Sequence, residues 1–178
     1  LKGTVTDAVG KTREVITEWK LKRIEETHGD YIEYVYETVD EPVRGGLVAK
    51  AIYLKEVHAG NSGQAPHTEV LFEGSKEKRL KSNSARYGFL TSSNRLLEKV
   101  TVKFQGSVLR SYVFSYGNGA FFKDVLTGVR QLDDKGTEVS FQNFGYYDDV
   151  QSNKGYVPFK DKQEEWNTHH DGLDAGFL

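Results

Sequence analysis

The sequence predicts an all-β fold in which antiparallel β-hairpins stack into a twisted sheet or partial shell, followed by a largely irregular C-terminal tail. Three observations support this prediction. The 178 residues include 10 Tyr, 10 Phe and 2 Trp, side chains that suit a pleated, half-buried surface. The 18 Gly outnumber the 3 Pro and fall between short segments, which is typical of turns. Within those segments apolar and polar residues alternate, as in strands with one buried face.

The first hairpin is predicted around Gly29. Residues 15–25 alternate, with Trp19 and Leu21 on one face, and residues 31–37 return after the turn. A connection of about three to five residues that contains Gly is typical of a β-hairpin.

Two further strands are predicted over residues 47–56 and 68–73, on either side of a polar loop. Residues 75–84 are rich in Lys, Arg and Ser and have almost no apolar content. We interpret that stretch as a solvated loop.

The remaining strands form two predicted hairpins. Residues 97–104 and 108–116 alternate strongly and flank a Gln-Gly-Ser turn. Residues 124–132 and 137–146 flank an Asp-Asp-Lys-Gly turn. The hairpins resemble degenerate copies of one unit, and such units need neighbours to cover their apolar faces.

The alternation also predicts which side chains form the core or a cross-strand ladder. These residues are Trp19, Leu21, Ile32, Tyr36, Val100, Val102, Tyr112, Phe114 and Phe141. We expect a hairpin domain over residues 1–147, and a tail over residues 148–178 that leads to a following module. The absence of Met indicates an excerpt from a longer polypeptide.

Composition argues against several functions. With 24 Lys and Arg against 26 Asp and Glu, the formal charge is −2, so there is no basic excess for binding nucleic acid. The apolar runs are too short for membrane insertion. The chain has no Cys, which excludes disulfides and thiolate chemistry.

The candidate chemical motifs are weak. His169, His170 and Asp171 are metal-ligand types, but adjacent side chains in an extended chain point to opposite sides. Residues 133–138 hold three carboxylates around a Gly, yet lack the ligand spacing of a calcium loop and favour a hairpin turn. The scattered His residues accompany no Gly-x-Ser-x-Gly motif. We therefore predict no catalytic, cofactor-binding or metal-binding residues, and no cofactor.

One segment of the sequence resembles a motif of a known protein family. Residues 19–36, from Trp19-Lys20-Leu21 to Tyr34-Val35-Tyr36, resemble a motif of the SpvB N-terminal and insecticidal toxin-complex B-component family, within the RHS/YD-repeat proteins. The resemblance continues through residues 95–102, 108–116 and 126–129, and ends at residues 141–146. It covers about residues 11–147.

The resemblance implies a function as well as a fold. It implies a non-catalytic scaffold segment of a large bacterial protein that is secreted or on the cell surface, where the hairpins form part of a β-shell. The implied partners are other domains of the same polypeptide or toxin-complex components. An alternative, based on the aromatic strands, is a β-sandwich module that binds carbohydrate or a host surface.

Overall fold

The computed structural model describes residues 1–119 and 123–146, so the predicted tail and its His169-His170-Asp171 motif lie outside the described residues. The described residues form a two-stranded sheet and a ten-stranded sheet. Their one short helical segment is a 3-10 turn at Arg44–Gly46. None of the described helical structure is long and apolar enough to span a bilayer. The predicted all-β, mainly antiparallel fold is confirmed.

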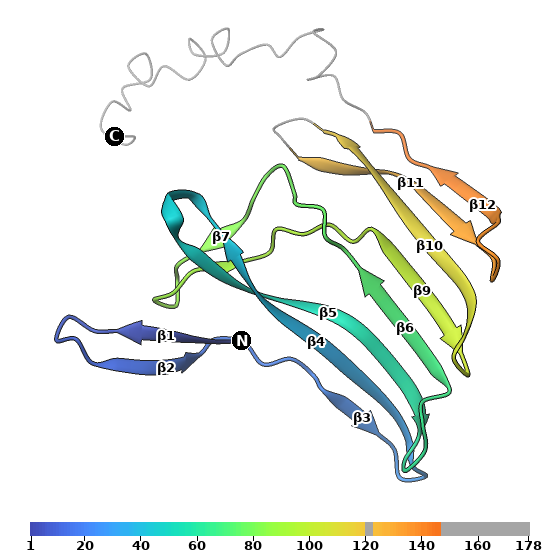
Figure 1. Cartoon of the computed structure of the whole chain (residues 1–178), viewed down its shortest axis with the longest axis horizontal. Helices are drawn as coiled ribbons and strands as arrows, with labels where there is room; N and C mark the ends of the chain where they lie inside the picture. Colours follow the sequence, from blue (N-terminus) through green and yellow to red (C-terminus); the bar gives the residue numbers. More distant parts are fainter. Residues whose placement is uncertain (120–122, 147–178) are drawn as a thin grey trace, which may run out of the picture. The chain divides into compact units, whose positions relative to one another are not determined.

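The large sheet is a meander. The strands are β1 (Lys2–Thr6), β2 (Thr12–Ile16), β3 (Arg23–Glu25), β4 (Asp30–Pro42), β5 (Val48–Asn61), β6 (Thr68–Glu73), β7 (Asn83–Ser84), β8 (Thr91–Ser92), β9 (Lys99–Phe104), β10 (Ser107–Asn118), β11 (Asp124–Leu132) and β12 (Glu138–Asn143). β1 and β2 form the small sheet. Eight strands of the large sheet lie in the order β12-β11-β10-β9-β6-β5-β4-β3, and neighbours along this path are antiparallel (Figure 1), while β7 and β8 pair with each other and β8 with β5 beside it. Successive hairpins therefore lie side by side, as the sequence predicts.

The turns reuse one hydrogen-bonding pattern. At the β11–β12 turn, the Asp133 carboxylate Oδ1 accepts the backbone N–H groups of Lys135 and Thr137, at 2.9 and 2.7 Å. Gly136 adopts a φ of +83°, a left-handed conformation that favours glycine. Asp7 organises the β1–β2 turn in the same way. The interpretation of residues 133–138 as a hairpin turn is confirmed.

Strand register divides the large sheet into two chemically different faces, because residues that lie opposite one another share a face. On the face that we call the apolar face, one row crosses four strands through Tyr34, Val57, Val70 and Val102. On the opposite, charged face, the adjoining row contains Arg23, Glu33, His58, Glu69 and Lys103. Basic and acidic residue types alternate along this row, which is favourable between neighbouring strands.

Burial across the sheet is low. The buried apolar residues among those described are Tyr31, Ala49, Ala51 and Leu96. The half-buried residues of the predicted core are Tyr36, Val100, Val102, Tyr112 and Phe114, all in strands of the large sheet. They lie on the apolar face and are covered mainly by neighbours within the sheet.

Four of the predicted core residues are exposed. Trp19 is 77% exposed and Leu21 is 55% exposed, and both lie in the irregular segment between β2 and β3, not in a strand. Ile32 and Phe141 are in strands but remain 39% and 47% exposed. The prediction of a core or ladder position is wrong for Trp19 and Leu21, whereas Ile32 and Phe141 lie in a cross-strand ladder, opposite Ala59 and Arg130, but not in a core. The alternation at residues 15–25 does not continue as a strand, and no described layer packs over the sheet at the other two positions.

The described strands also do not form the sandwich of the alternative interpretation. A sandwich needs two facing sheets of comparable size. Here the ten-stranded sheet is accompanied by a two-stranded hairpin, whose Gly3 and Val5 lie against Phe89 and Gly88. A Cβ placed on Gly3 would lie 2.4 Å from the Phe89 ring, so the hairpin backbone lies in close contact with that ring.

Candidate functional site

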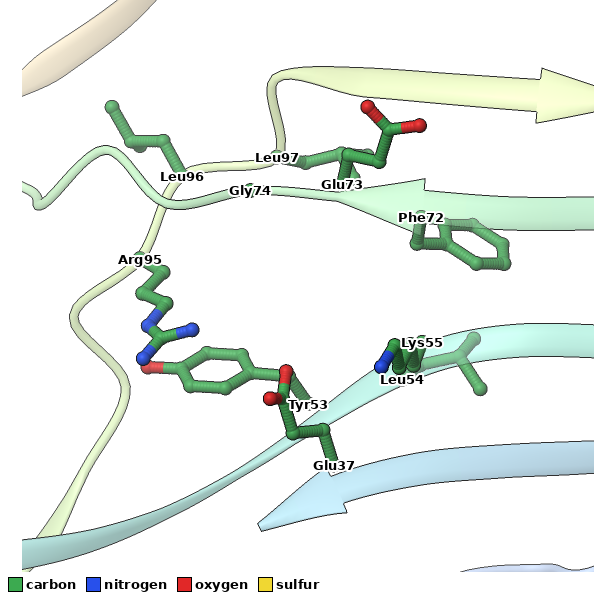
Figure 2. A pocket seen from close by; sticks show the side chains of 10 residues that line it. All are labelled: Glu37, Tyr53, Leu54, Lys55, Phe72, Glu73, Gly74, Arg95, Leu96 and Leu97. Atoms are coloured by element: carbon green, nitrogen blue, oxygen red, sulfur yellow. The ribbon is translucent and has the colours of Figure 1, made fainter. Parts of the chain in front are cut away.

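A split in the large sheet creates the candidate site. β5 pairs with β6 only between residues 56–59 and 68–71, and beyond that point the two strands diverge. The segment that leads into β9 fills part of the gap, with the Leu96 carbonyl against Gly74. A cavity of about 340 Å³ remains (Figure 2), lined by Glu37, Tyr53, Leu54, Lys55, Phe72, Glu73, Gly74, Arg95, Leu96 and Leu97.

A nearly buried carboxylate organises one wall of this cavity. Glu41, at the end of β4, is 8% exposed. Its carboxylate accepts hydrogen bonds from the Tyr53 hydroxyl at 2.8 Å, the Ser92 hydroxyl at 2.6 Å and the Arg95 Nε at 3.1 Å. The Arg95 guanidinium also lies 5.2 Å from the centre of the Tyr53 ring. We call these four residues the Glu41 network.

Asn94 extends the Glu41 network into the preceding loop. Its side chain is buried, with 3% of the residue exposed, and its amide nitrogen donates to Asn83 Oδ1 at 2.9 Å. Its Oδ1 accepts the backbone N–H of Ser82 at 2.7 Å, and its own backbone N–H donates to the Tyr53 hydroxyl at 3.0 Å. The residues that look like a solvated loop in the sequence are therefore held to β5 by specific hydrogen bonds.

Burial and neighbouring groups shift the pKa of Tyr53. Burial raises the pKa of its hydroxyl, and the adjacent Glu41 carboxylate raises it further. The backbone N–H of Asn94 acts in the opposite direction. The hydroxyl thus stays protonated and can donate to Glu41 while it accepts from Asn94.

A second carboxylate, that of Glu98, binds the first residues of the segment that connects β6 to β9. Glu98 Oε2 accepts the backbone N–H groups of Ser75 and Lys76 at 2.8 and 3.0 Å, and the Ser75 hydroxyl at 2.9 Å. These donors lower the pKa of Glu98. Burial, and then the charge of Glu98, raises the pKa of Tyr116, whose hydroxyl donates to the Leu97 carbonyl at 2.7 Å.

The side chains that line the cavity are apolar, charged and, at Tyr53, phenolic. The residues that line the cavity include no Ser, Thr or His, so they supply no hydroxyl nucleophile with an imidazole base. Within residues 1–119 and 123–146, no group of three or more His, Asp or Glu side chains is placed to hold a metal ion. The cavity instead combines apolar walls with Lys55 and Arg95 as cations and Glu37 and Glu73 as anions.

The predicted core residues do not meet at this cavity. Tyr36, Val100, Val102, Tyr112 and Phe114 lie on the apolar face, and Trp19 and Leu21 precede β3. Sequence reasoning missed Glu41 and Asn94 entirely. The Glu41–Arg95 contact joins residues 54 positions apart, and no local pattern signals it.

A long antiparallel meander with one apolar face, together with a polar network that fixes a loop, defines an antiparallel β-domain. No family model and no curated protein matches the chain. Among solved structures it is similar to the N-terminal domain of the effector protein SpvB from Salmonella typhimurium strain LT2, with a TM-score of 0.55 and 15% identity over 73% of this chain and 54% of that one. It also matches TcdB2-TccC3 without its hypervariable C-terminal region, with a TM-score of 0.47 and 17% identity over 76% of this chain and 9% of that one.

The likeness to the SpvB domain shows a shared fold. This chain spans about half of the length of that domain. The resemblance that the sequence indicates is thus supported at the level of the fold.

Proposed function

We propose that this chain is a non-catalytic scaffold segment of a large bacterial protein of the RHS or toxin-complex type, secreted or on the cell surface, in which its sheet forms part of a β-shell. Its partners in this proposal are other domains of the same polypeptide or toxin-complex components. It binds no nucleic acid and does not insert into a membrane. The fold shared with the SpvB N-terminal domain supports the proposal.

The observation that most supports the proposal is the apolar face of the large sheet. Its side chains are only half-buried, and the described residues provide no second layer over most of it. An apolar surface of this kind, interrupted here at Arg110 and Gln131, is typical of an interface in a soluble protein. A wall that packs against other parts of a larger assembly would use such a face.

Hydroxyl-radical footprinting tests the proposal on the natural full-length polypeptide that contains this sequence. We expect Tyr34, Tyr112 and Phe114, on the apolar face, to be oxidised more slowly in that polypeptide than in the 178-residue chain alone. His58, on the charged face, serves as the control and should react at a similar rate in both.

Two results would overturn the proposal. Equal oxidation rates at Tyr34, Tyr112 and Phe114 in both samples would show that no other domain covers the apolar face. Reproducible binding on a glycan array, lost on replacing the exposed Trp19, would favour the carbohydrate-binding alternative.

A further inference from the structure

The edge strand β12, at one end of the large sheet, is unusually exposed to solvent. β12 lies beside β11 alone in the described structure (Figure 1). Its six residues Glu138–Asn143 are all exposed. Val139 is 62% exposed and Phe141 is 47% exposed. Natural edge strands are commonly protected by Lys, Pro or very short length. β12 has neither Lys nor Pro, whereas β3 at the other end has three residues and an Arg23–Glu25 ion pair.

The backbone register shows which groups of β12 are available. The Phe144 N–H donates to the Thr127 carbonyl at 3.0 Å, so the alternate residues 140 and 142 also direct their backbone groups toward β11. The N–H and C=O groups of Phe141 and Asn143 therefore point away from β11. The bulge in this strand pair lies at Val139, which leaves residues 140–144 regular.

We propose that β12 pairs with β12 of a second copy of this chain, antiparallel and about a two-fold axis at Gln142. Residues 140–144 are the regular part of the edge, so a two-fold axis at their midpoint gives the longest regular overlap. Phe141 then faces Asn143 of the partner copy on both sides of the axis, and each such pair exchanges two backbone hydrogen bonds. Gln142 faces its own counterpart.

Charge supports a second copy as the occupant. Residues 139–146 contain no charged side chain, so self-pairing brings no like charges together. A two-fold contact of this kind also closes on itself, which limits assembly to a dimer. The inference is independent of the proposed function, because it concerns the sheet edge and not the apolar face.

The oligomeric state of the full 178-residue chain tests the proposal, by size-exclusion chromatography with light scattering over a range of concentrations. We expect a dimer. Asn143→Pro removes a donor that points away from β11, so it should leave the β11–β12 ladder intact and give a monomer. Asn143→Thr keeps the donor and should remain dimeric. A monomeric wild-type chain at all concentrations, or a dimer that persists in folded Asn143→Pro, would overturn the proposal.

A charge pair at the proposed axis provides a second variant if Asn143→Pro fails to fold. Gln142→Lys places two ammonium groups opposite each other, and Gln142→Glu places two carboxylates there. Each variant alone should be monomeric, and their equimolar mixture should form a mixed dimer. A dimer in either single variant, or no association in the mixture, would contradict the pairing.

Disulfide cross-linking tests the register, since the chain has no Cys of its own. In the proposed pair the two copies of residue 142 are a non-hydrogen-bonded pair with Cα atoms about 4.5 Å apart, within disulfide range. Gln142→Cys should therefore form a covalent dimer under mild oxidation. Ser140→Cys is the matched control, because its two copies would be four residues out of register, about 14 Å apart. Cross-linking of Ser140→Cys to an equal extent would overturn the assigned register and the edge contact.

Discussion

Replacing Glu41 with Ala should destabilise the fold by about 3 kcal/mol. The carboxylate accepts three hydrogen bonds, and a hydrogen bond to a charged group contributes roughly 1.5–3 kcal/mol. The Arg95 side chain is 29% exposed, so solvent screens that bond and we place it near 1 kcal/mol. Because the three bonds share one acceptor, their contributions are not additive, and the total is below their sum. The variant should melt about 6–12 °C below the wild type.

Thermal and urea unfolding measure this loss of stability. Two further variants show whether the loss is due to the Glu41 carboxylate. Glu41→Gln keeps the size of the side chain and one acceptor, so its loss should be intermediate. Glu37→Ala removes another acid of β4 that lines the same cavity but is exposed, and should change stability by less than about 0.5 kcal/mol. A free energy of unfolding for Glu41→Ala within about 0.5 kcal/mol of the wild type would refute the reasoning that the Glu41 network anchors the loop.

Three further predictions follow from the described contacts. Trp19→Ala should change the free energy of unfolding by less than about 0.5 kcal/mol because the ring is 77% exposed, and a loss of several kcal/mol in a urea titration would contradict this. Because the pKa of Glu98 is lowered in the folded state, its contribution to stability is present above the pKa of the unfolded state and is lost as the pH falls through the folded pKa. Glu98→Gln should therefore reduce the fall in the free energy of unfolding at acidic pH, which urea titrations over a range of pH measure. Gly74→Ala places a Cβ 2.2 Å from the Leu96 carbonyl oxygen and should cost about 1–3 kcal/mol by thermal melting, whereas Gly145→Ala, with no atom within 4 Å, should be neutral.

Strand alternation and turn chemistry were sufficient to predict most of the meander from the sequence. The segment 68–73 is a strand with the predicted bounds, and so is 124–132. The Gly106 turn also forms where predicted, with Gln105 and Gly106 at φ values of +48° and +78°. Both kinds of signal are local, because a strand pattern and its turn lie within about 20 residues of each other.

The candidate site could not be predicted because its contacts are not local. Glu41 lies in an alternating strand where an exposed acid would look the same. Asn94 belongs to a polar stretch, and burial of a polar side chain is set by the hydrogen bonds that tertiary structure brings to it. The burial of Ile32 and Phe141 was mispredicted for a related reason, since alternation predicts a shared face but does not supply the layer that would bury these side chains.

The meander also has a consequence for how the protein unfolds. Along the path from β12 to β3 each strand pairs with the strand on either side, and β5 alone of these also pairs with β8, so the sheet is close to a linear array in which stability is a sum of nearest-neighbour terms. Such an array can lose strands from its ends while the middle stays folded. Hydrogen exchange should therefore be graded along the sheet, fastest in β12 and β3 and slowest near β5 and β6, and unfolding need not be a single all-or-none event.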